Sequence, residues 1–246
     1  YLYRLKLSLF RSGDPVPVDE TFRTFGLRSF RAEGKKFTLN GKPVFLRGYV
    51  DCCIFPLTGY PVWDEEAYRR QFRIAKSYGF NHVRLHGWTA PKPFWRAADA
   101  EGMLVQAELP NWSLHYRTRT KPADAEAHAY LARELEAVLD TLNEHPSFVM
   151  LSLGNELIGR DGHEQLNELV RTARRLDPTR LYTDNTGFGD LPAHGREGDY
   201  FVPTLNWHPP FHIDQAASPD TTQDFGAVTR LEDKPLIAHE HGQFTM

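Results

Sequence analysis

The stretch Phe148-Val149-Met150-Leu151-Ser152-Leu153-Gly154-Asn155-Glu156 is a short apolar run that ends in an amide and a carboxylate. Turn-forming residues precede it at 145–147 and Gly154 follows it, so it predicts a short buried strand. An ionised carboxylate beside a sheet core is costly unless it is paired or hydrogen-bonded. Glu156 is therefore either a partly exposed residue that begins a loop or a member of a functional site.

A second stretch has the same shape. Pro235-Leu236-Ile237-Ala238-His239-Glu240-His241-Gly242 is again an apolar run that ends in Glu and then Gly. Neighbouring strands of a closed parallel barrel could bring Glu156 and Glu240 together, although 84 positions separate them. Two carboxylates at one place are the working groups of glycoside hydrolysis, one as proton donor and the other as nucleophile or base.

The histidines beside Glu240 raise the question of a metal. In a strand, His239 and His241 would face away from Glu240, and the zinc-protease spacing His-Glu-x-x-His is absent from the sequence. Cys52 and Cys53 are the only cysteines, and neighbours in a strand point to opposite faces, so they indicate neither a disulfide framework nor a zinc site. We predict no metal and no cofactor.

Length and composition fit one large domain. The 246 residues, 41% of them hydrophobic, suffice for a single α/β barrel. A net charge of −3 without a basic cluster does not indicate a nucleic-acid partner. No apolar run reaches the roughly 18 residues of a membrane span. The amino terminus carries no signal-peptide pattern, so the compartment is unknown.

Strands and helices alternate from Pro43 onward, which calls for a parallel sheet and favours a (β/α)8 TIM barrel. No Gly-rich phosphate loop follows the first strand, which disfavours a Rossmann fold. Seven strands are expected, so the barrel apparently lacks its last strand–helix unit, and we predict self-association or a need for missing segments of the parent chain. The expected strands are 44–46, 82–85, 103–107, 148–152, 180–183, 201–206 and 235–238, with helices at 65–78, 93–101, around 131–142 and from about 162 to 176.

The amino-terminal residues have a different pattern. Tyr1 to Leu9 alternate, with Leu5 and Leu7 on one face, as in a half-buried antiparallel strand. We interpret it as the last strand of a β-sandwich, joined to the barrel by a linker at residues 13–19. The expected domains are 1–30, the end of an immunoglobulin-like sandwich with its linker, and 31–246, the barrel. Asn40-Gly41 predicts a hairpin turn.

The site of a parallel barrel lies at the carboxyl ends of its strands. Acids, amides, histidines and tryptophans recur there, which is the set that binds a sugar: polar groups for hydroxyls and indole faces for the ring. The residues at this rim are Asp51, Arg84, His86, Trp88, Glu108, Trp112, Asn155, Glu156, Asp184, Asn185, Asn206, Trp207, His208 and Glu240.

Several segments together resemble glycoside hydrolase family 2, which includes β-galactosidases, β-glucuronidases and β-mannosidases. They are residues 24–28 (TFGLR), 39–48 (LNGKPVFLRG), 81–84 (NHVR), 145–147 (HPS) and 152–156 (SLGNE). The resemblance implies a barrel preceded by β-sandwich domains. It also implies that Glu156 is the acid/base, Asn155 binds the sugar 2-hydroxyl, Glu240 is the nucleophile and Arg84 steadies that nucleophile.

The chain departs from the family pattern at three places. Val50-Asp51-Cys52-Cys53 stands where the family has Asn-Arg-His-Glu, and His86-Gly87-Trp88 replaces Ser-His-Tyr. His208 replaces the tyrosine after the sixth strand. These changes concern the walls of the site and leave both glutamates in place. The sequence therefore supports catalysis better than any particular sugar, and the family's named specificities are not transferred.

The favoured function is a retaining exo-acting β-glycosidase on a glycoside or oligosaccharide, with the two carboxyls about 5–5.5 Å apart. Glu156, kept protonated by its anionic neighbour, would protonate the leaving oxygen while Glu240 attacks the anomeric carbon. Two alternatives stay open: a carbohydrate-binding barrel without catalysis, suggested by the altered loops, and an endo-acting glycanase of the same clan.

Individual site residues also have structural interpretations. Arg84 could pair with an acid inside the barrel, and Glu108 could be that kind of satisfied buried acid. His86 could hydrogen-bond a loop. Each of Trp88, Trp112 and Trp207 could belong to the core instead of a sugar platform, and Asp51 and Asp184 have only their position in support.

Overall fold

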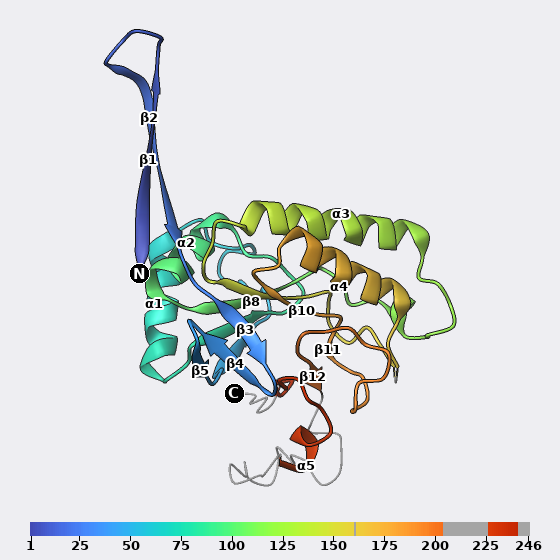
Figure 1. Cartoon of the computed structure of the whole chain (residues 1–246). Coiled ribbons are helices and arrows are strands. Elements are labelled where there is room, and N and C mark those ends of the chain that lie inside the picture. Colours follow the sequence, from blue (N-terminus) through green and yellow to red (C-terminus); the bar gives the residue numbers. More distant parts are fainter. Residues whose placement is uncertain (160, 204–225, 241–246) are drawn as a thin grey trace.

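A computed structural model of the chain describes residues 1–159, 161–203 and 226–240. Its centre is a five-stranded parallel sheet in the order β10-β9-β8-β7-β6 (Figure 1). The strands are β6 (Gly48–Asp51), β7 (His82–Leu85), β8 (Leu104–Glu108), β9 (Phe148–Ser152) and β10 (Leu181–Thr183). The α/β class and four of the expected strand positions are confirmed.

The first strand is a correction. We expected it at 44–46, but Val44 ends the short strand β5 (Lys42–Val44) and Phe45 is 77% exposed. The parallel strand is β6, whose Gly48 pairs with His82 and whose Val50 pairs with Arg84. The more apolar run was mistaken for the buried strand.

Segments that follow β10 in the sequence also pair in parallel. β11 (Thr186–Gly187) pairs with β12 (Val202–Pro203), Asn155 forms a bridge to Thr186, and Phe201 forms one to Leu236. Residues 235–239 run beside 201–203 through backbone hydrogen bonds. Of the expected sixth strand, the described residues 201–203 are extended and run parallel to the expected seventh strand, although the regular pairing is short.

Helices follow the strands at the predicted places. α1 (Glu65–Ser77) begins at Asp64, whose side chain accepts from the Glu66 amide, as expected for an N-cap. The other helices are α2 (Lys92–Glu101), the 3-10 turn η1 (Leu114–Tyr116), α3 (Ala125–Leu142), α4 (Glu164–Leu176) and α5 (Gly226–Thr229). α3 and α4 lie side by side on one side of the sheet (Figure 1). No helix among the described residues is long and apolar enough to cross a membrane.

Alternation along the strands produces two apolar regions. Val83 and Leu85 of β7 pack with the helices in the larger cluster, outside the sheet. Met150 of β9 belongs to a smaller cluster with Phe37 and Tyr200. This second cluster lies under an antiparallel meander of β3 (Phe30–Glu33), β4 (Lys36–Leu39) and β5, whose turn has positive φ at Asn40 (52°) and Gly41 (73°). The hairpin turn predicted from Asn40-Gly41 is confirmed.

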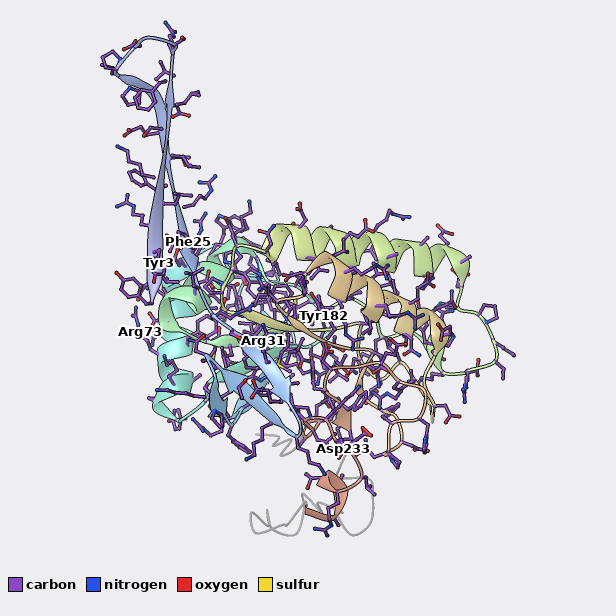
Figure 2. The ribbon with its side chains drawn as sticks, viewed as in Figure 1. Tyr3, Phe25, Arg31, Arg73, Tyr182 and Asp233 are labelled. Carbon is purple, nitrogen blue, oxygen red and sulfur yellow. The ribbon has the colours of Figure 1, made fainter. Side chains whose placement is uncertain are left out.

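The amino-terminal residues form a hairpin. β1 (Leu2–Phe10) pairs antiparallel with β2 (Pro17–Gly26) and the pair extends away from the rest of the molecule (Figure 1). Tyr3 and Phe25 stack near its base, with ring centres 5.4 Å apart (Figure 2). The expected linker at 13–19 is therefore wrong, because Pro17–Asp19 already belong to β2. Leu9 is 63% exposed, not half-buried. The assignment of 1–30 to a preceding sandwich stays a prediction.

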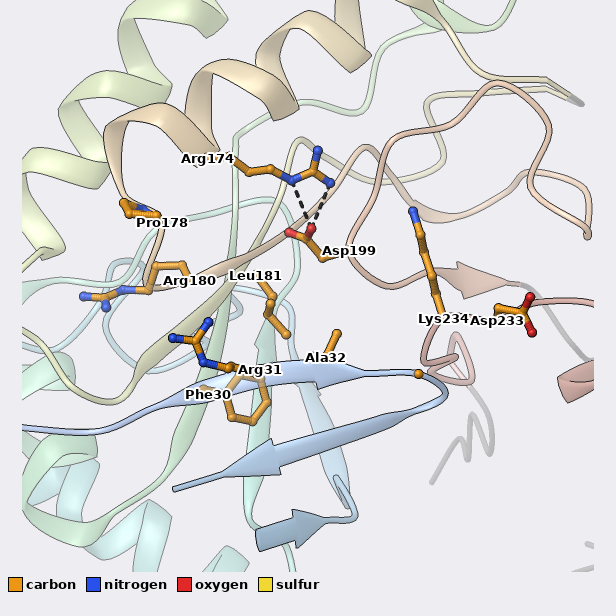
Figure 3. Close-up of a pocket in the computed structure, with 11 residues that line it drawn as sticks. Phe30, Arg31, Ala32, Arg174, Pro178, Arg180, Leu181, Asp199, Asp233 and Lys234 are labelled. Carbon is orange, nitrogen blue, oxygen red and sulfur yellow. Dashed lines mark hydrogen bonds and ion pairs between the residues drawn. The ribbon is translucent and has the colours of Figure 1, made fainter. Parts of the chain in front are cut away.

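A groove of about 450 Å³ opens near the amino-terminal ends of the strands, between β3 and the segment that joins α4 to β10. Figure 3 shows Arg174 of α4 paired there with Asp199, at 2.8 Å between Nη2 and Oδ1. None of the residues predicted for the functional site lines this groove. The candidate site lies at the other end of the sheet.

Candidate active site

Arg84 and Glu108 form the buried base of the site. The guanidinium Nε and Nη2 of Arg84 donate to the two oxygens of Glu108 at 2.6 and 3.2 Å. Glu108 is fully buried and also accepts from Thr186 Oγ1 at 2.7 Å and from the Gly87 amide at 3.0 Å. Its oxygens are thus occupied by protein donors. Glu108 is the satisfied buried acid that was one of its two predicted interpretations, and it lies beneath the site instead of facing a substrate.

A buried polar chain continues from Glu108 into the barrel. Gln106 Nε2 donates to Glu108 Oε1 at 3.2 Å, and the Tyr200 hydroxyl donates to Gln106 Oε1 at 3.0 Å. Burial raises the pKa of Tyr200 well above its ordinary value, so this hydroxyl stays a donor. Sequence patterns missed both residues, because a lone Gln or Tyr in a strand carries no signal of such a role.

Glu240 faces Arg84 at the rim. Arg84 Nη1 is 3.2 Å and His86 Nε2 is 3.5 Å from Glu240 Oε1. His239 Nε2 lies 3.2 Å from the same oxygen. The hydrogen bond with His239 lowers the pKa of Glu240, burial opposes this, and the charge of Arg84 adds to it, which leaves the pKa at about 2. Glu240 is therefore a carboxylate across the physiological pH range.

The contact between His239 and Glu240 corrects a prediction. We expected the histidines beside Glu240 to face away from it, as strand neighbours do. Glu240 instead has a φ of 45°, in the left-handed region, which ends the extended run and turns its side chain back beside His239. His241 lies outside the described residues.

Asn155 contacts both Arg84 and His239. It is 1% exposed, and its Oδ1 accepts from Arg84 Nη2 at 2.7 Å. His239 Nε2 is 3.3 Å from the same oxygen. The amide Nδ2 is buried and has no hydrogen-bond partner among the described residues. A buried donor of this kind is costly, so it indicates a place where a ligand acceptor can bind.

Glu156 is the second carboxylate of the rim. Its Oε2 accepts from Trp112 Nε1 at 3.1 Å, and its backbone amide donates to the Thr186 carbonyl at 2.8 Å. At Gly187 an added Cβ would lie 3.1 Å from Glu156 Cγ and 2.9 Å from His239 Cε1. Since both side chains approach the same point, Glu156 and the His239-Glu240 pair lie on the same side of the rim.

The aromatic and histidine predictions have different outcomes. His86 contacts Glu240, as described, and its ring meets that of Trp112 edge to face at 5.2 Å. Trp112 is 62% exposed, so its indole is available at the surface of the site. Trp88 is buried against Phe55 and donates to the Asp51 carbonyl at 3.2 Å, so its interpretation as a core residue holds.

Asp51 does not join the cluster around Glu240. Its Oδ2 accepts from Gln71 of α1 at 3.4 Å, which places this side chain on the outer face of β6. Val50 pairs with Arg84 and therefore shares the inner face, so alternation along β6 places Cys52 on the inner face as well. Burial first, and then the charge of Glu240, raise the pKa of the Cys52 thiol. Cys52 is a rim residue that the sequence did not single out.

The remaining predicted residues are structural or undescribed. Asp184 pairs with Arg196 at 2.8 and 2.9 Å in full burial, and Asn185 accepts from the Leu157 amide at 2.6 Å. Neither is available to bind a hydroxyl. Asn206, Trp207 and His208 lie outside the described residues. Within the described part of the chain, no group of three or more His, Cys, Asp or Glu side chains is placed to hold a metal ion.

A family model described as "Glycosyl hydrolases family 2, TIM barrel domain" matches residues 30–245. The chain belongs to this family. The match covers the meander, the parallel sheet and both glutamates, and it confirms the resemblance inferred from the short motifs. It also confirms the TIM-barrel class that the repeated strand–helix alternation predicted.

Curated relatives carry the names of two glycosidases. A β-galactosidase of Vibrio vulnificus (strain YJ016) is 30% identical over 181 residues, which are 73% of this chain and 17% of the relative. A β-glucuronidase of Paenibacillus borealis is 27% identical over 191 residues, which are 74% of this chain and 32% of the relative. The chain thus spans a third or less of the length of these relatives.

Solved structures of family members have the same fold. Ruminococcus gnavus β-glucuronidase superposes with a TM-score of 0.71 at 25% identity, covering 85% of this chain and 37% of that one. Bacteroides uniformis β-glucuronidase 3 superposes with a TM-score of 0.64 at 27% identity, covering 83% of this chain and 26% of that one. Two different sugars appear in the names of the relatives, so they leave the sugar of this chain open.

Proposed function

We propose that the protein is a retaining, exo-acting β-glycoside hydrolase in which Glu240 is the nucleophile and Glu156 the acid/base. The observation that carries the proposal is the arrangement of Glu240, Arg84 and Asn155, joined by direct hydrogen bonds, with Glu156 next to Asn155 on the same rim. The relatives named β-galactosidase and β-glucuronidase support the reaction class, β-glycoside hydrolysis.

Glu240 has the properties of a nucleophile. It must be ionised and oriented before it attacks, and its pKa of about 2 satisfies the first condition. Arg84 and His239 both contact Oε1 at 3.2 Å, which satisfies the second condition. In the first step, a bond forms between a Glu240 oxygen and the anomeric carbon while the bond from that carbon to the leaving oxygen breaks.

Glu156 protonates the leaving oxygen in that first step. Because it then carries a negative charge, it can take a proton from water in the second step, and the resulting hydroxide displaces Glu240 from the sugar. The Trp112 indole donates to Oε2 at 3.1 Å and so orients the carboxyl group of Glu156. Glu156 is held on one side by Trp112, which is exposed, so a leaving group can reach it from solvent.

Asn155 supplies the contact to the sugar 2-hydroxyl. Its Oδ1 is taken by Arg84, and its Nδ2 points to no protein acceptor among the described residues, so Nδ2 is the donor left for substrate. A contact at the 2-hydroxyl that tightens as positive charge develops at the neighbouring carbon lowers the barrier, and does more than bind the substrate.

The test is hydrolysis by the intact protein of aryl β-galactoside, β-glucuronide and β-mannoside. Glu156→Gln should lower kcat/KM by about 100- to 10,000-fold on a poor leaving group and much less on an activated one, since only the poor one needs the proton. A 2-deoxy-2-fluoro glycoside should label Glu240, as mass spectrometry of the peptides would detect. Glu66→Gln, the same change on the exposed face of α1, is the matched control.

The outcomes separate the candidate functions. Equal inactivity of wild type and Glu156→Gln across the panel would contradict the proposal. Glycan binding that survives Glu240→Gln in a protein without turnover would indicate the non-catalytic barrel. Internal cleavage of oligosaccharides, instead of release of single sugars from the end, would indicate the endo-acting alternative.

A further inference from the structure

His239 is buried at the centre of the candidate site, and the double-displacement chemistry uses it only as a contact of Glu240. It is 4% exposed, and its Nε2 faces two oxygens, Glu240 Oε1 at 3.2 Å and Asn155 Oδ1 at 3.3 Å. These are the group proposed to attack the sugar and the group proposed to bind its 2-hydroxyl. A single ring nitrogen thus contacts both.

The neighbours of His239 Nε2 show whether this nitrogen carries a hydrogen. A guanidinium has donors only, and Arg84 Nη2 lies 2.7 Å from the Asn155 side chain, so the amide atom there must be the oxygen. His239 Nε2 therefore faces two acceptors, a carboxylate oxygen and an amide oxygen. It has to carry a hydrogen, which it shares between them.

Arg84 and His239 consequently contact the same two atoms. Arg84 donates to Glu240 Oε1 through Nη1 and to Asn155 Oδ1 through Nη2. With both donors directed at Oδ1, the amide of Asn155 is fixed with Nδ2 facing away from them, and Nδ2 is the buried donor that lacks a partner among the described residues. If the donor of His239 is lost, the amide loses one of the two contacts that fix its orientation.

We propose that His239 is a positioning residue that fixes the Asn155 amide and the Glu240 carboxylate relative to each other. Nδ2 of Asn155 can then bind the 2-hydroxyl of the same sugar that Glu240 attacks. The inference rests on the proposed function, because it needs a sugar bound at Glu240. Gly187 makes room for the ring: an added Cβ would lie 3.0 Å from His239 Nε2.

The experiment compares an aryl β-glycoside that the wild type accepts with its 2-deoxy counterpart, in the intact protein. His239→Leu removes the donor, and His239→Gln keeps an N–H at the place of Nε2. His82→Gln is the matched control, because His82 is equally buried, at 3% exposure, but lies at the opposite end of β7 from the site.

We expect His239→Leu to lower kcat/KM on the 2-hydroxy substrate by about 10- to 100-fold, the range of a lost hydrogen bond to a charged group. The 2-deoxy substrate does not use Asn155, so it should lose about tenfold less, and the preference for the 2-hydroxyl should shrink accordingly. His239→Gln should restore most of that preference, and His82→Gln should leave it unchanged. Equal losses on both substrates would overturn the inference, since they would show that His239 does not act on the 2-hydroxyl contact through Asn155.

A crystal structure of His239→Leu gives a test that needs no turnover. The Asn155 amide or the Glu240 carboxylate should move from its wild-type position, and unchanged positions of both would overturn the inference. If the wild type hydrolyses no glycoside, the proposed function fails, while the crystal structure still decides whether His239 positions its two neighbours.

Discussion

Replacing Glu108 by Gln perturbs the charge at the centre of the barrel without changing its size. Oε1 of Glu108 accepts from Arg84, Thr186 and Gln106 at 2.6, 2.7 and 3.2 Å, and Oε2 accepts from Arg84 and the Gly87 amide at 3.2 and 3.0 Å. All of these neighbours are donors. The amide nitrogen of Gln would face donors in either orientation, so the substitution removes a charge and also creates a clash between donors.

The magnitude follows from burial. Glu108 is 0% and Arg84 6% exposed, and removing one partner of a buried ion pair costs about 3–5 kcal/mol because the remaining charge is uncompensated. Arg84 keeps Glu240 as a second carboxylate partner at 3.2 Å, so we expect the lower end, about 3 kcal/mol. That is a large part of the roughly 5–15 kcal/mol that stabilises a typical domain.

The assay is urea unfolding of the intact protein at pH 7, followed through tryptophan fluorescence, with Trp95 of α2 fully buried. Glu66→Gln is the control, since it makes the same chemical change in an exposed pair with Arg73 at 2.7 Å and should change stability little. The double variant Arg84→Met with Glu108→Leu removes both charges of the pair, but the Gly87 amide, Thr186 and Gln106 lose their acceptor, so we expect it to regain only part of the lost stability. It should have no turnover, since Glu240 then lacks Arg84. A loss in Glu108→Gln no larger than that in Glu66→Gln would refute the reasoning.

Three further predictions concern the rim. The pKa of Glu240 is depressed to about 2, so its ionisation stabilises the fold above about pH 4.5, and this contribution is lost as pH falls toward 2. Glu240→Gln should therefore make the free energy of unfolding depend less on pH in that window, as unfolding measured at a series of acid pH values would show. Trp112→Phe removes the donor at 3.1 Å from Glu156 and should lower kcat/KM by about 2- to 10-fold without changing the unfolding midpoint; an unchanged kcat/KM would count against a role for the indole. Burial and then the charge of Glu240 raise the pKa of the Cys52 thiol, whereas burial and then the charge of Asp51 raise the pKa of the Cys53 thiol. Glu240→Gln should therefore speed the alkylation of Cys52 by iodoacetamide at pH 8 and leave the rate at Cys53 unchanged. Equal rates at Cys52 in both proteins, read by mass spectrometry of the peptides, would mean that its thiol does not face Glu240.

Sequence periodicity was sufficient to locate the elements in which one face is apolar and buried. The helix predicted at 65–78 lies at Glu65–Ser77, where Asp64 is its N-cap and Tyr68 and Phe72 are buried. The strand ending at Ser152 was predicted from its apolar run between turn residues. In both cases the local pattern and the tertiary contacts agree, so the pattern alone located the element.

Register was what the sequence could not supply. Asp51 was selected because acids bind hydroxyls, but which residue of β6 faces the site depends on the pairing of Val50 with Arg84. A shift by one residue exchanges the two faces of a strand, so Cys52 and not Asp51 is directed inward. In the same way, Glu108 has the chemistry of a substrate contact, and only its burial under Arg84 shows that it supports the site from below.

The two proposed catalytic carboxylates share a backbone feature. It explains why His239 faces Glu240, although strand alternation predicted that it would face away. Glu156 has a φ of 52° and Glu240 a φ of 45°, both in the left-handed region, where a residue with a side chain costs roughly 1–2 kcal/mol. In a continuing strand, neighbours alternate between faces, so only one residue of each pair could reach the site. The left-handed turn at each Glu removes this restriction, and Asn155 with Glu156, like His239 with Glu240, brings two consecutive side chains to the same side of the rim. Four polar groups thus come from two strand ends. Backbone strain of this size persists only where surrounding contacts fix it. The Glu156 amide is fixed by its hydrogen bond to the Thr186 carbonyl, and the Glu240 carboxylate by its hydrogen bond from Arg84, so these contacts help to maintain the two turns that present the acids.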